Sequence, residues 1–381
     1  MALNLGILFV FKYLNFSLQT AGRLLGHDFA LFDILLPAGI SFYTFQSVGY
    51  TIDVYRGQKP TKNFVDYALF VSFFPQLVAG PIERSAKLLP QFAAVRKLSL
   101  DKFHGGLLLI LWGLFKKMVI ADRVAVVVNF VYAENRTNGY LYIAAAVLFC
   151  IQIYCDFSAY TDIARGSARM LGIELMENFR APFFADSVKE FWRRWHISLS
   201  TWFKDYLYFT LGGSRRGKLR TYINLLIVFG ISGLWHGAAL TFVVWGLLNG
   251  LYQIIEDLIH KKIRILSNIV TFALTAIAFV FFRAPSVHTA FHALGTMARN
   301  TSISGVLEGQ SLINAQITLK YVYVLLAAAA VLAAADILKP RIKKIPFFVK
   351  YVFYFLLTMS IIIFGYYGTA YDAADFIYFR F

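Results

Sequence analysis

Long apolar segments separated by short basic stretches run along the whole chain. A helix that crosses a membrane needs about 20 consecutive, mostly apolar residues. The segments that approach this pattern are 3–18, 29–52, 64–79, 105–121, 140–154, 222–235, 238–259, 269–282, 321–338 and 347–367. Two shorter apolar segments, 124–132 and 160–171, are typical of interfacial or partly embedded helices. The pattern predicts an all-α polytopic membrane protein with about 8–11 transmembrane helices.

Composition supports this interpretation and argues against a soluble protein. Only 15% of the 381 residues are charged and 59% are hydrophobic, whereas about 25% of a soluble domain is charged. The mean hydropathy is +0.61. A soluble chain of this composition would lack the polar surface to cover its core. Because the apolar segments extend over residues 1–381, we predict a single transmembrane domain.

The net charge of +16 comes largely from basic loops. These loops lie at 55–62, 83–102, 174–220 and 339–344. Lys and Arg concentrate in the cytoplasmic loops of membrane proteins, so we expect the 174–220 segment to be cytoplasmic or re-entrant. Basic cytoplasmic loops beside membrane lipid account for the positive net charge, so we expect no nucleic-acid binding. The polar 300–316 segment is predicted to be an outward loop.

A polar break interrupts the apolar pattern at SGLWHG, residues 232–237. The preceding 222–235 segment gives about 21 Å of helix, which is shorter than the hydrocarbon core of about 30 Å. We therefore expect His236 at membrane depth, where irregular backbone is tolerated only inside protein or beside water. An imidazole there can accept a proton from a hydroxyl near neutral pH. A structural histidine bonded to a carbonyl of a neighbouring helix explains the pattern equally well.

A second unusual segment is FWRRWHISLSTW, residues 191–202, in the predicted cytoplasmic region. Mixed aromatic and basic residues are typical of an interfacial amphipathic helix, with Trp at headgroup level and Arg beside lipid phosphates. The functional interpretation adds that His196 and the arginines face the entry of an anionic donor. A guanidinium suits a phosphate because its fork donates two hydrogen bonds at once.

The third polar feature is CDFSAYTD, residues 155–162, beside an apolar segment. Its carboxylates, Asp156 and Asp162, can orient a histidine or pair with an arginine such as Arg165 or Arg194. The alternative is a solvated helix end, at which Asp156 or Ser158 is an N-cap. The residue types favour a structural role for both carboxylates.

Other reaction motifs are absent from the sequence. It contains no GxSxG elbow, glycine-rich phosphate loop or HExxH. No second ligand stands at helical spacing from His236, so we expect no metal. The two cysteines, Cys150 and Cys155, form no CxxC pattern and are predicted to be free thiols packed among helices. The remaining histidines are typical of loops and helix ends: His27, His104, His260, His288 and His292.

With these segments, the chain resembles the membrane-bound O-acyltransferase (MBOAT) family, and in particular its bacterial alginate O-acetyltransferase branch. Besides the segments at 156–162, 191–199 and 233–237, the similarity includes ISFYTFQ (40–46), FPQLVAGPIER (74–84) and NFRAPF (178–183). Each segment alone is modest evidence, but all of them in this order are highly specific. The resemblance also implies that N-terminal spans usual in the family are missing from this sequence.

The resemblance implies a ring of helices around a thinned centre, with a central funnel or tunnel. It matches the invariant family histidine to His236 and a second, cytoplasmic-side histidine to His196, and both are candidate catalytic residues. Residues around them are expected to bind the donor, and a further polar set to be structural. The candidate donor-binding residues are Trp192, Arg193, Arg194, Trp195, Ser198 and Trp235, and the structural polar residues are Asp156, Asp162 and Asn178.

The implied function is O-acylation at the bacterial cytoplasmic (inner) membrane. An acyl group, acetyl by the branch expectation, passes from a cytoplasmic thioester, either acetyl-CoA or an acyl carrier, toward hydroxyls of an extracytoplasmic polysaccharide. Transfer is direct or runs through an extracytoplasmic acetyltransferase partner, and no bound cofactor is expected. His236 accepts or orients the hydroxyl proton, and His196 orients the donor or stabilises charge at the carbonyl oxygen.

Two other functions remain open on the sequence. In a transporter or flippase, polar residues at depth would line a substrate path. In a membrane docking partner of a separate transferase, His236 would be structural.

Overall fold

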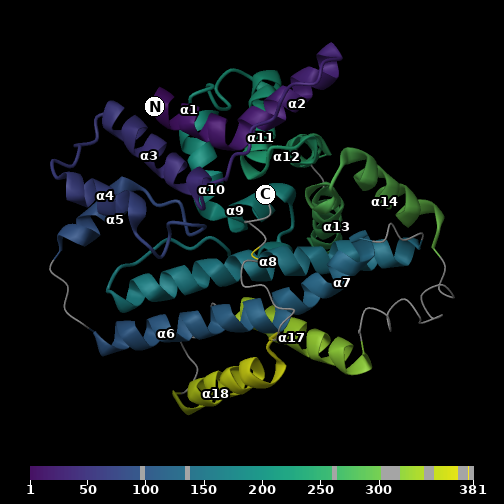
Figure 1. The fold of residues 1–381 in the computed structure, drawn as a ribbon. Coiled ribbons are helices and arrows are strands. Elements are labelled where there is room, and N and C mark those ends of the chain that lie inside the picture. Colours follow the sequence, from purple (N-terminus) through teal and green to yellow (C-terminus); the bar gives the residue numbers. More distant parts are fainter. Residues whose placement is uncertain are drawn as a thin grey trace.

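All regular secondary structure in the described part of the chain is helical (Figure 1), which confirms the predicted all-α class. The computed structural model describes residues 1–94, 99–133, 138–259, 264–301, 318–338, 347–367 and 376. Elements η1, η2 and η4 are π-helical turns, and η3 is a 3-10 turn. The elements are α1 (Ala2–Leu8), η1 (Phe9–Tyr13), α2 (Leu14–Leu25), α3 (Ile40–Tyr55), α4 (Phe64–Ser72), α5 (Ser85–Ala93), α6 (Leu100–Leu114), η2 (Phe115–Ala121), α7 (Asp122–Ala133), α8 (Gly139–Met170), η3 (Pro182–Phe184), α9 (Val188–Arg194), α10 (Ile197–Phe203), η4 (Lys204–Tyr208), α11 (Lys218–His236), α12 (Leu240–Ile259), α13 (Arg264–Arg283), α14 (Val287–Arg299), α17 (Leu319–Leu338) and α18 (Phe347–Phe364).

Within the described residues, five helical stretches are long and apolar enough to cross a membrane, judged by length and composition. The first two unite segments that the sequence pattern separated, 105–121 with 124–132 and 140–154 with 160–171. The polar residues at those junctions do not end the helices, because they form ion pairs inside the protein. The five stretches are Leu100–Ala133, Gly139–Met170, Leu240–Ile259, Leu266–Arg283 and Lys320–Leu338, and Tyr351–Phe364 is a shorter apolar helix.

Two long helical rods form the middle of the molecule (Figure 1). α6, η2 and α7 make one rod, and α8 packs alongside it. The backbones approach closely at Gly106 and Gly166, since a Cβ added to Gly106 would lie 2.5 Å from the Gly166 carbonyl oxygen. Small residues at such a crossing allow the packing that holds helices together in lipid. α17 and α18 contact this pair around η2 and lie on one side of it in Figure 1.

Two predicted spans are shorter helices than the sequence pattern indicated. The 29–52 segment is helical only from Ile40, in α3, and the 64–79 segment only as far as Ser72, in α4. Pro37 and Pro75 stand in the non-helical parts. Proline removes a backbone donor and disfavours helical backbone at the residue before it. Apolar composition alone therefore overestimated the length of both helices.

The 174–220 segment folds into the helical body between α8 and α11. Its short elements η3, α9 and η4 contact α11, α12 and α13. Phe191, Trp195 and Leu199 in this segment are all buried. The segment therefore contributes side chains to the protein core.

Two further expectations can be compared with the structure. Cys150 and Cys155 are buried free thiols, as predicted. The basic 339–344 loop, His260 and positions 302–316 of the predicted outward loop lie outside the described residues.

Candidate active site

α11 brings His236 to a close contact with α12. His236 is the last residue of Lys218–His236, and Gly237 continues in extended backbone. A Cβ added to Gly233 would collide with the carbonyl oxygen of Phe242 in α12. Glycine in this segment therefore lets the two helices approach, and the end of α11 is held inside the protein.

Aromatic rings surround the His236 imidazole. The ring centroids of Trp235 and Trp245 each lie 5.0 Å from it, and that of Phe282 lies 5.6 Å away. His236 is only 4% exposed. An uncharged imidazole has a ring nitrogen that can accept a proton.

His196 occupies a strained turn between α9 and α10. Its φ of 43° and ψ of 54° lie in the left-handed region, which few residues other than glycine adopt. Such backbone strain costs about 1–3 kcal/mol and is concentrated at functional sites. The single amphipathic helix expected over 191–202 is therefore wrong, because this turn divides it into two short helices.

Asn178 holds the His196 turn from the preceding connection. Its carbonyl oxygen accepts a hydrogen bond from Ile197 N, and its Oδ1 accepts one from Ser198 N, each at 3.0 Å. Asn178 is 1% exposed. A buried side chain that accepts a hydrogen bond from a backbone N–H stabilises one local conformation, which here is that of the turn.

The fold brings the two candidate catalytic histidines together. The ring centroids of His196 and His236 lie 6.2 Å apart at an interplanar angle of 64°. Phe157 of α8 lies 4.7 Å from the His196 ring, and Phe42 of α3 lies 6.4 Å from it. Trp235 contacts both histidines, at 6.1 Å from His196 and 5.0 Å from His236. Helices α3, α8 and α11 and the turn before α10 thus meet at this histidine pair, which we define as His196 and His236.

Two predicted donor-binding residues, Trp192 and Trp195, are buried in the protein core. Trp192 Nε1 donates a hydrogen bond to Asn249 Oδ1 at 3.1 Å. Trp195 stacks on Phe191, with ring centroids 5.4 Å apart. Both tryptophans are less than a tenth exposed, so their rings connect the 174–220 segment to the helices around it.

The two predicted donor-binding arginines pair with one glutamate. Arg193 Nη1 lies 3.4 Å from Glu190 Oε2, and Arg194 Nε lies 2.9 Å from Glu190 Oε1. The Arg193 side chain is 67% exposed. Of the remaining candidates, Trp235 contacts both histidines, and Ser198 Oγ accepts a hydrogen bond from Ile82 N at 3.0 Å.

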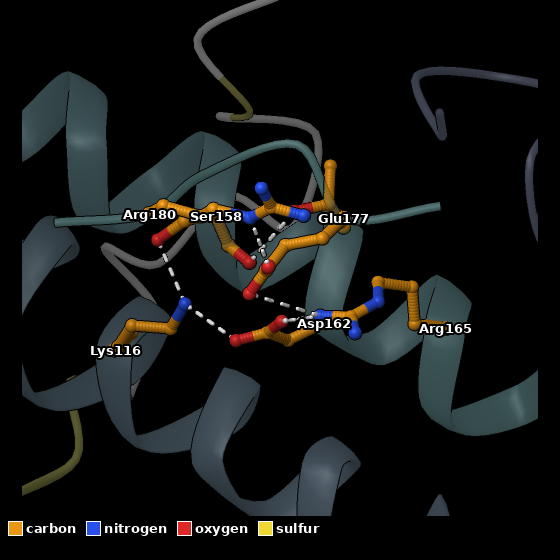
Figure 2. A network of polar contacts seen from close by, with 7 residues as sticks. Lys116, Ser158, Asp162, Arg165, Glu177 and Arg180 are labelled. Carbon is orange, nitrogen blue, oxygen red and sulfur yellow. Dashed lines mark hydrogen bonds and ion pairs between the residues drawn. The ribbon is translucent and has the colours of Figure 1, made fainter. Parts of the chain in front are cut away.

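A charge network connects the two central rods (Figure 2). Lys116 of η2 donates to Ser158 Oγ at 2.7 Å and to Asp162 Oδ2 at 2.8 Å. Arg165 donates to the other oxygen of Asp162 at 3.3 Å. The predicted pairing of this carboxylate with an arginine is therefore present in the structure.

The charge network continues into the connection that holds the His196 turn. Arg165 Nη1 lies 3.9 Å from Glu177, whose other carboxylate oxygen lies 2.8 Å from Arg180 Nε (Figure 2). Asn178 is the next residue after Glu177. The position of Asn178 is thus tied to α8 by the ion pair between Arg165 and Glu177.

Lys117 extends the charge network further along η2. It pairs with Asp122 at 2.7 Å and with Asp156 at 2.9 Å. Asp156 is 3% exposed and lies within α8, so the alternative of a solvated N-cap is wrong. We define the charge network as four cations and four anions: Lys116, Lys117, Arg165, Arg180, Asp122, Asp156, Asp162 and Glu177.

Sequence reasoning missed three lysines whose positions carried a signal. Lys116 and Lys117 lie inside the apolar 105–121 segment, and Lys12 lies inside the apolar 3–18 segment. Charges at such positions are costly and tend to have specific partners. In the structure all three lie in π-helical turns, η1 and η2. Departures of this kind from α-helix are frequent at functional sites.

Glu83 is a buried carboxyl in the connection before α5. Its Oε1 accepts a hydrogen bond from Met176 N at 2.6 Å. Burial raises the pKa of Glu83 to about 7, although the Met176 bond and nearby cations such as Lys87 and Arg84 act in the opposite direction. The group is therefore poised to change its charge near neutral pH. Among the described residues, no cluster of His, Cys, Asp and Glu could hold a metal ion.

The sequence that builds this site matches a known protein family. The model of the family described as MBOAT, membrane-bound O-acyltransferase, matches residues 58–298, which include both histidines. The chain therefore belongs to the membrane-bound O-acyltransferase family.

Similar curated proteins come from several bacteria. A probable alginate O-acetylase of Pseudomonas putida is 43% identical over 305 residues, which cover 77% of this chain and 62% of the relative. A peptidoglycan O-acetyltransferase of Helicobacter pylori is 36% identical over 79% of this chain and 64% of the relative. A teichoic acid D-alanyltransferase of Bacillus subtilis is 28% identical over 66% of this chain and 69% of the relative. The chain thus spans less than two thirds of the length of the alginate O-acetylases that it matches.

Proposed function

We propose that this protein is an O-acyltransferase of the bacterial cytoplasmic membrane. It moves an acyl group, acetyl by analogy with its relatives, from a cytoplasmic thioester donor toward hydroxyls of an extracytoplasmic polysaccharide. Transfer is direct or runs through an extracytoplasmic partner protein. The observation that carries the proposal is the buried histidine pair, with ring centroids 6.2 Å apart, in a chain of this family.

In this proposal His236 acts on the acceptor hydroxyl. Its imidazole takes the hydroxyl proton while the oxygen attacks the thioester carbonyl carbon, and the carbon–sulfur bond then breaks. The thiolate leaves and receives the proton from the imidazolium, so the enzyme returns to its starting state. A positioned general base contributes about 10²–10⁴-fold to such a reaction. The aromatic surroundings of His236 keep water from competing as the acceptor.

His196 has the supporting role. Its ring lies beside the His236 ring and belongs to the 174–220 segment. We propose that this segment faces the cytoplasm and receives the donor. Its residues Arg193 and Arg194 then contact the anionic part of the donor. His196 then orients the thioester or stabilises the charge that develops on its carbonyl oxygen.

We also propose that the helices form a ring around the histidine pair. The rings that line the pair come from different helices, with Phe42 in α3, Phe157 in α8, Trp245 in α12 and Phe282 in α13. Helices that all point aromatic side chains to one place are compatible with a central passage in which donor and acceptor meet.

The test is acyl transfer in isolated membranes. Labelled acetyl-CoA is supplied on the cytoplasmic side, with candidate polysaccharide and partner fractions present. Wild type, His236→Ala and His196→Ala are compared at equal abundance. We expect label in the polysaccharide or partner fraction for wild type only, with the strongest loss in His236→Ala.

Two results would contradict the proposal. Transfer that is indifferent to His236 would favour a docking role for this protein beside a separate transferase. Movement of the acyl donor or of polysaccharide across the membrane without thioester cleavage would favour a transporter.

A further inference from the structure

The end of α11, where His236 lies, is held by η1, a segment close to the N-terminus. The last four carbonyl groups of an α-helix have no partner within the helix. In α11 the Gly233 carbonyl accepts a hydrogen bond from Gly237 N at 3.4 Å. The next carbonyl, that of Leu234, accepts one from Tyr13 Oη at 3.1 Å. The final two carbonyls belong to residues of the site and are bound by a charged group.

That charged group is the ammonium of Lys12. Its Nζ donates to the Trp235 carbonyl oxygen at 2.7 Å and to the His236 carbonyl oxygen at 3.3 Å. A cation at this position also meets the negative end of the helix dipole, which is strongest in the last turn. Lys12 therefore fixes the backbone of the two residues whose rings line the site.

The third donor of the same ammonium reaches a different helix. Lys12 Nζ donates to Ser41 Oγ, at the start of α3, at 3.1 Å. The following residue, Phe42, contacts the Trp235 ring at 5.2 Å and the His196 ring at 6.4 Å. One side chain thus ties α11 to α3 at the point where both contribute rings to the histidine pair.

The π-helical turn η1 makes this reach possible. Lys12 and Tyr13 both lie in η1, within an otherwise α-helical stretch, and both bind carbonyls at the end of α11. A π-helical turn rotates the side chains that follow it relative to a regular α-helix. A lone ammonium placed among apolar helices is costly unless acceptors surround it, and here three acceptors do.

We propose that Lys12 is a positioning residue for His236: its ammonium fixes the terminal carbonyls of α11 and so sets the direction in which the His236 imidazole points. The catalytic consequence rests on the proposed acyltransferase function. Lys12 itself does not touch the reacting atoms. A displacement of a catalytic group by about 1 Å can lower a rate by about 10²-fold, so the effect belongs in kcat rather than in donor binding.

The test compares three variants of the full chain in membranes. Lys12→Met keeps an unbranched side chain one atom shorter than lysine and removes the charge, whereas Lys12→Arg keeps a cation. Tyr13→Phe is the matched control, because it removes one neutral hydrogen bond to the same helix end. For each variant, kcat and the donor KM are measured at equal abundance, together with the thermal unfolding temperature in detergent.

We expect Lys12→Met to lower kcat by about 10–100-fold with a donor KM within about 2-fold of wild type. Lys12→Arg should recover at least half of that loss on a logarithmic scale, and Tyr13→Phe should lower kcat by less than about 3-fold. A purely structural role would instead lower abundance and unfolding temperature and leave the kcat of the remaining folded protein unchanged. That result would overturn the proposal, as would a rise in donor KM at constant kcat.

A second readout separates this inference from the proposed function. The rate at which diethyl pyrocarbonate modifies His236, followed by mass spectrometry, reports the position of the imidazole without any turnover. We expect this rate to change by about 3-fold or more in Lys12→Met and to stay near wild type in Tyr13→Phe. If His236→Ala transfers acyl groups normally while Lys12→Met alters the modification rate, the proposed function fails and the positioning role stands. An unaltered modification rate in Lys12→Met overturns the positioning role.

Discussion

Two regions of this protein bury polar side chains among apolar helices, and they do so in opposite ways. In the charge network every ion has an opposite charge within 4 Å, as between Lys117 and Asp156. Around the histidine pair the neighbours are aromatic rings, with Trp235, Trp245 and Phe282 lining His236. The network pairs each charge with an opposite one, whereas the rings of the histidine pair face aromatic side chains and the Lys12 ammonium binds the backbone carbonyl of His236.

On the proposed acyltransferase function, the difference separates a structural use of polarity from a chemical one. Buried ions need partners, because leaving one uncompensated costs several kcal/mol. The pairs Lys116–Asp162 and Lys117–Asp156 join the two central rods. An imidazole among aromatic rings has dry surroundings and can pass between two protonation states during a reaction. Polar residues at membrane depth must therefore be sorted by their surroundings before a function is assigned to them.

The largest expected effect comes from replacing His236 with an amide. His236→Gln keeps polar atoms in the site but removes the proton acceptor, so we expect acyl transfer to fall by about 10²–10⁴-fold. The unfolding temperature in detergent should stay close to that of wild type, because no charge is left without a partner. Steady-state transfer and thermal unfolding of the same preparation check both statements. A large loss of unfolding temperature would place His236 with the structural residues and break the comparison.

Lys117→Met should have the opposite effect to His236→Gln, because we expect it to lower the stability of the protein. It removes the cation that faces Asp122 and Asp156, and we expect a loss of about 3–5 kcal/mol in the free energy of unfolding. Abundance in membranes and thermal unfolding in detergent measure this loss. The double variant Lys117→Met with Asp156→Asn is the control, and it should recover part of the stability. Normal stability of the single variant would show that the network is not the structural region.

Asn178→Ala tests the link between the two regions. It removes the Oδ1 that accepts from Ser198 N, and a buried donor left without an acceptor costs about 1–3 kcal/mol. We also expect lower acyl transfer, because the His196 turn loses its support. Asn178→Asp keeps an acceptor at the same place and serves as the matched variant. If Asn178→Ala and Asn178→Asp behave alike in both assays, the hydrogen bond does not set the turn.

The pH dependence of stability distinguishes Glu83 from the paired carboxylates. Its pKa is raised from 4.5 to about 7 in the folded protein, so the unfolded chain loses this proton at lower pH than the folded one. The contribution of Glu83 to stability is therefore present below about pH 4.5 and is lost as the pH rises to about 7. Glu83→Gln should remove this part of the dependence in unfolding experiments between about pH 5 and about pH 8. An identical pH dependence in Glu83→Gln and wild type would contradict the assignment.

The smallest effect is expected at Arg193. The Arg193 side chain, which pairs with Glu190, is 67% exposed. Surface ion pairs of this kind contribute about 0–1 kcal/mol to stability. If Arg193 contacts the anionic donor as proposed, Arg193→Ala raises the donor KM by about 5-fold at constant kcat. Lys189→Ala, an exposed lysine on the same helix, is the control. Equal KM values for both variants would remove Arg193 from the donor site.

Much of the fold and of the site could be predicted from the sequence. Apolar run length identified the helices, because lipid forces a spanning backbone to satisfy its own hydrogen bonds. Where it failed, as at Pro37 and Pro75, local backbone chemistry ended the helix inside an apolar stretch. His236 stood out as a polar residue at membrane depth, where a structural role was equally well supported, and the family resemblance then singled out both His236 and His196 as candidate catalytic residues.

By itself the sequence determined the helical membrane class, the family and the two histidines of the candidate site. Those properties depend on composition, run length and order of segments, all of which are local to the chain. Only the tertiary structure decided that Asp156 lies in mid-helix beside Lys117, that His196 adopts a left-handed turn, and that Lys12 binds the end of α11. These contacts join residues far apart in sequence, and their free energy depends on which groups share a buried space. A local sequence pattern does not predict these contacts, because they form only when the helices pack against one another.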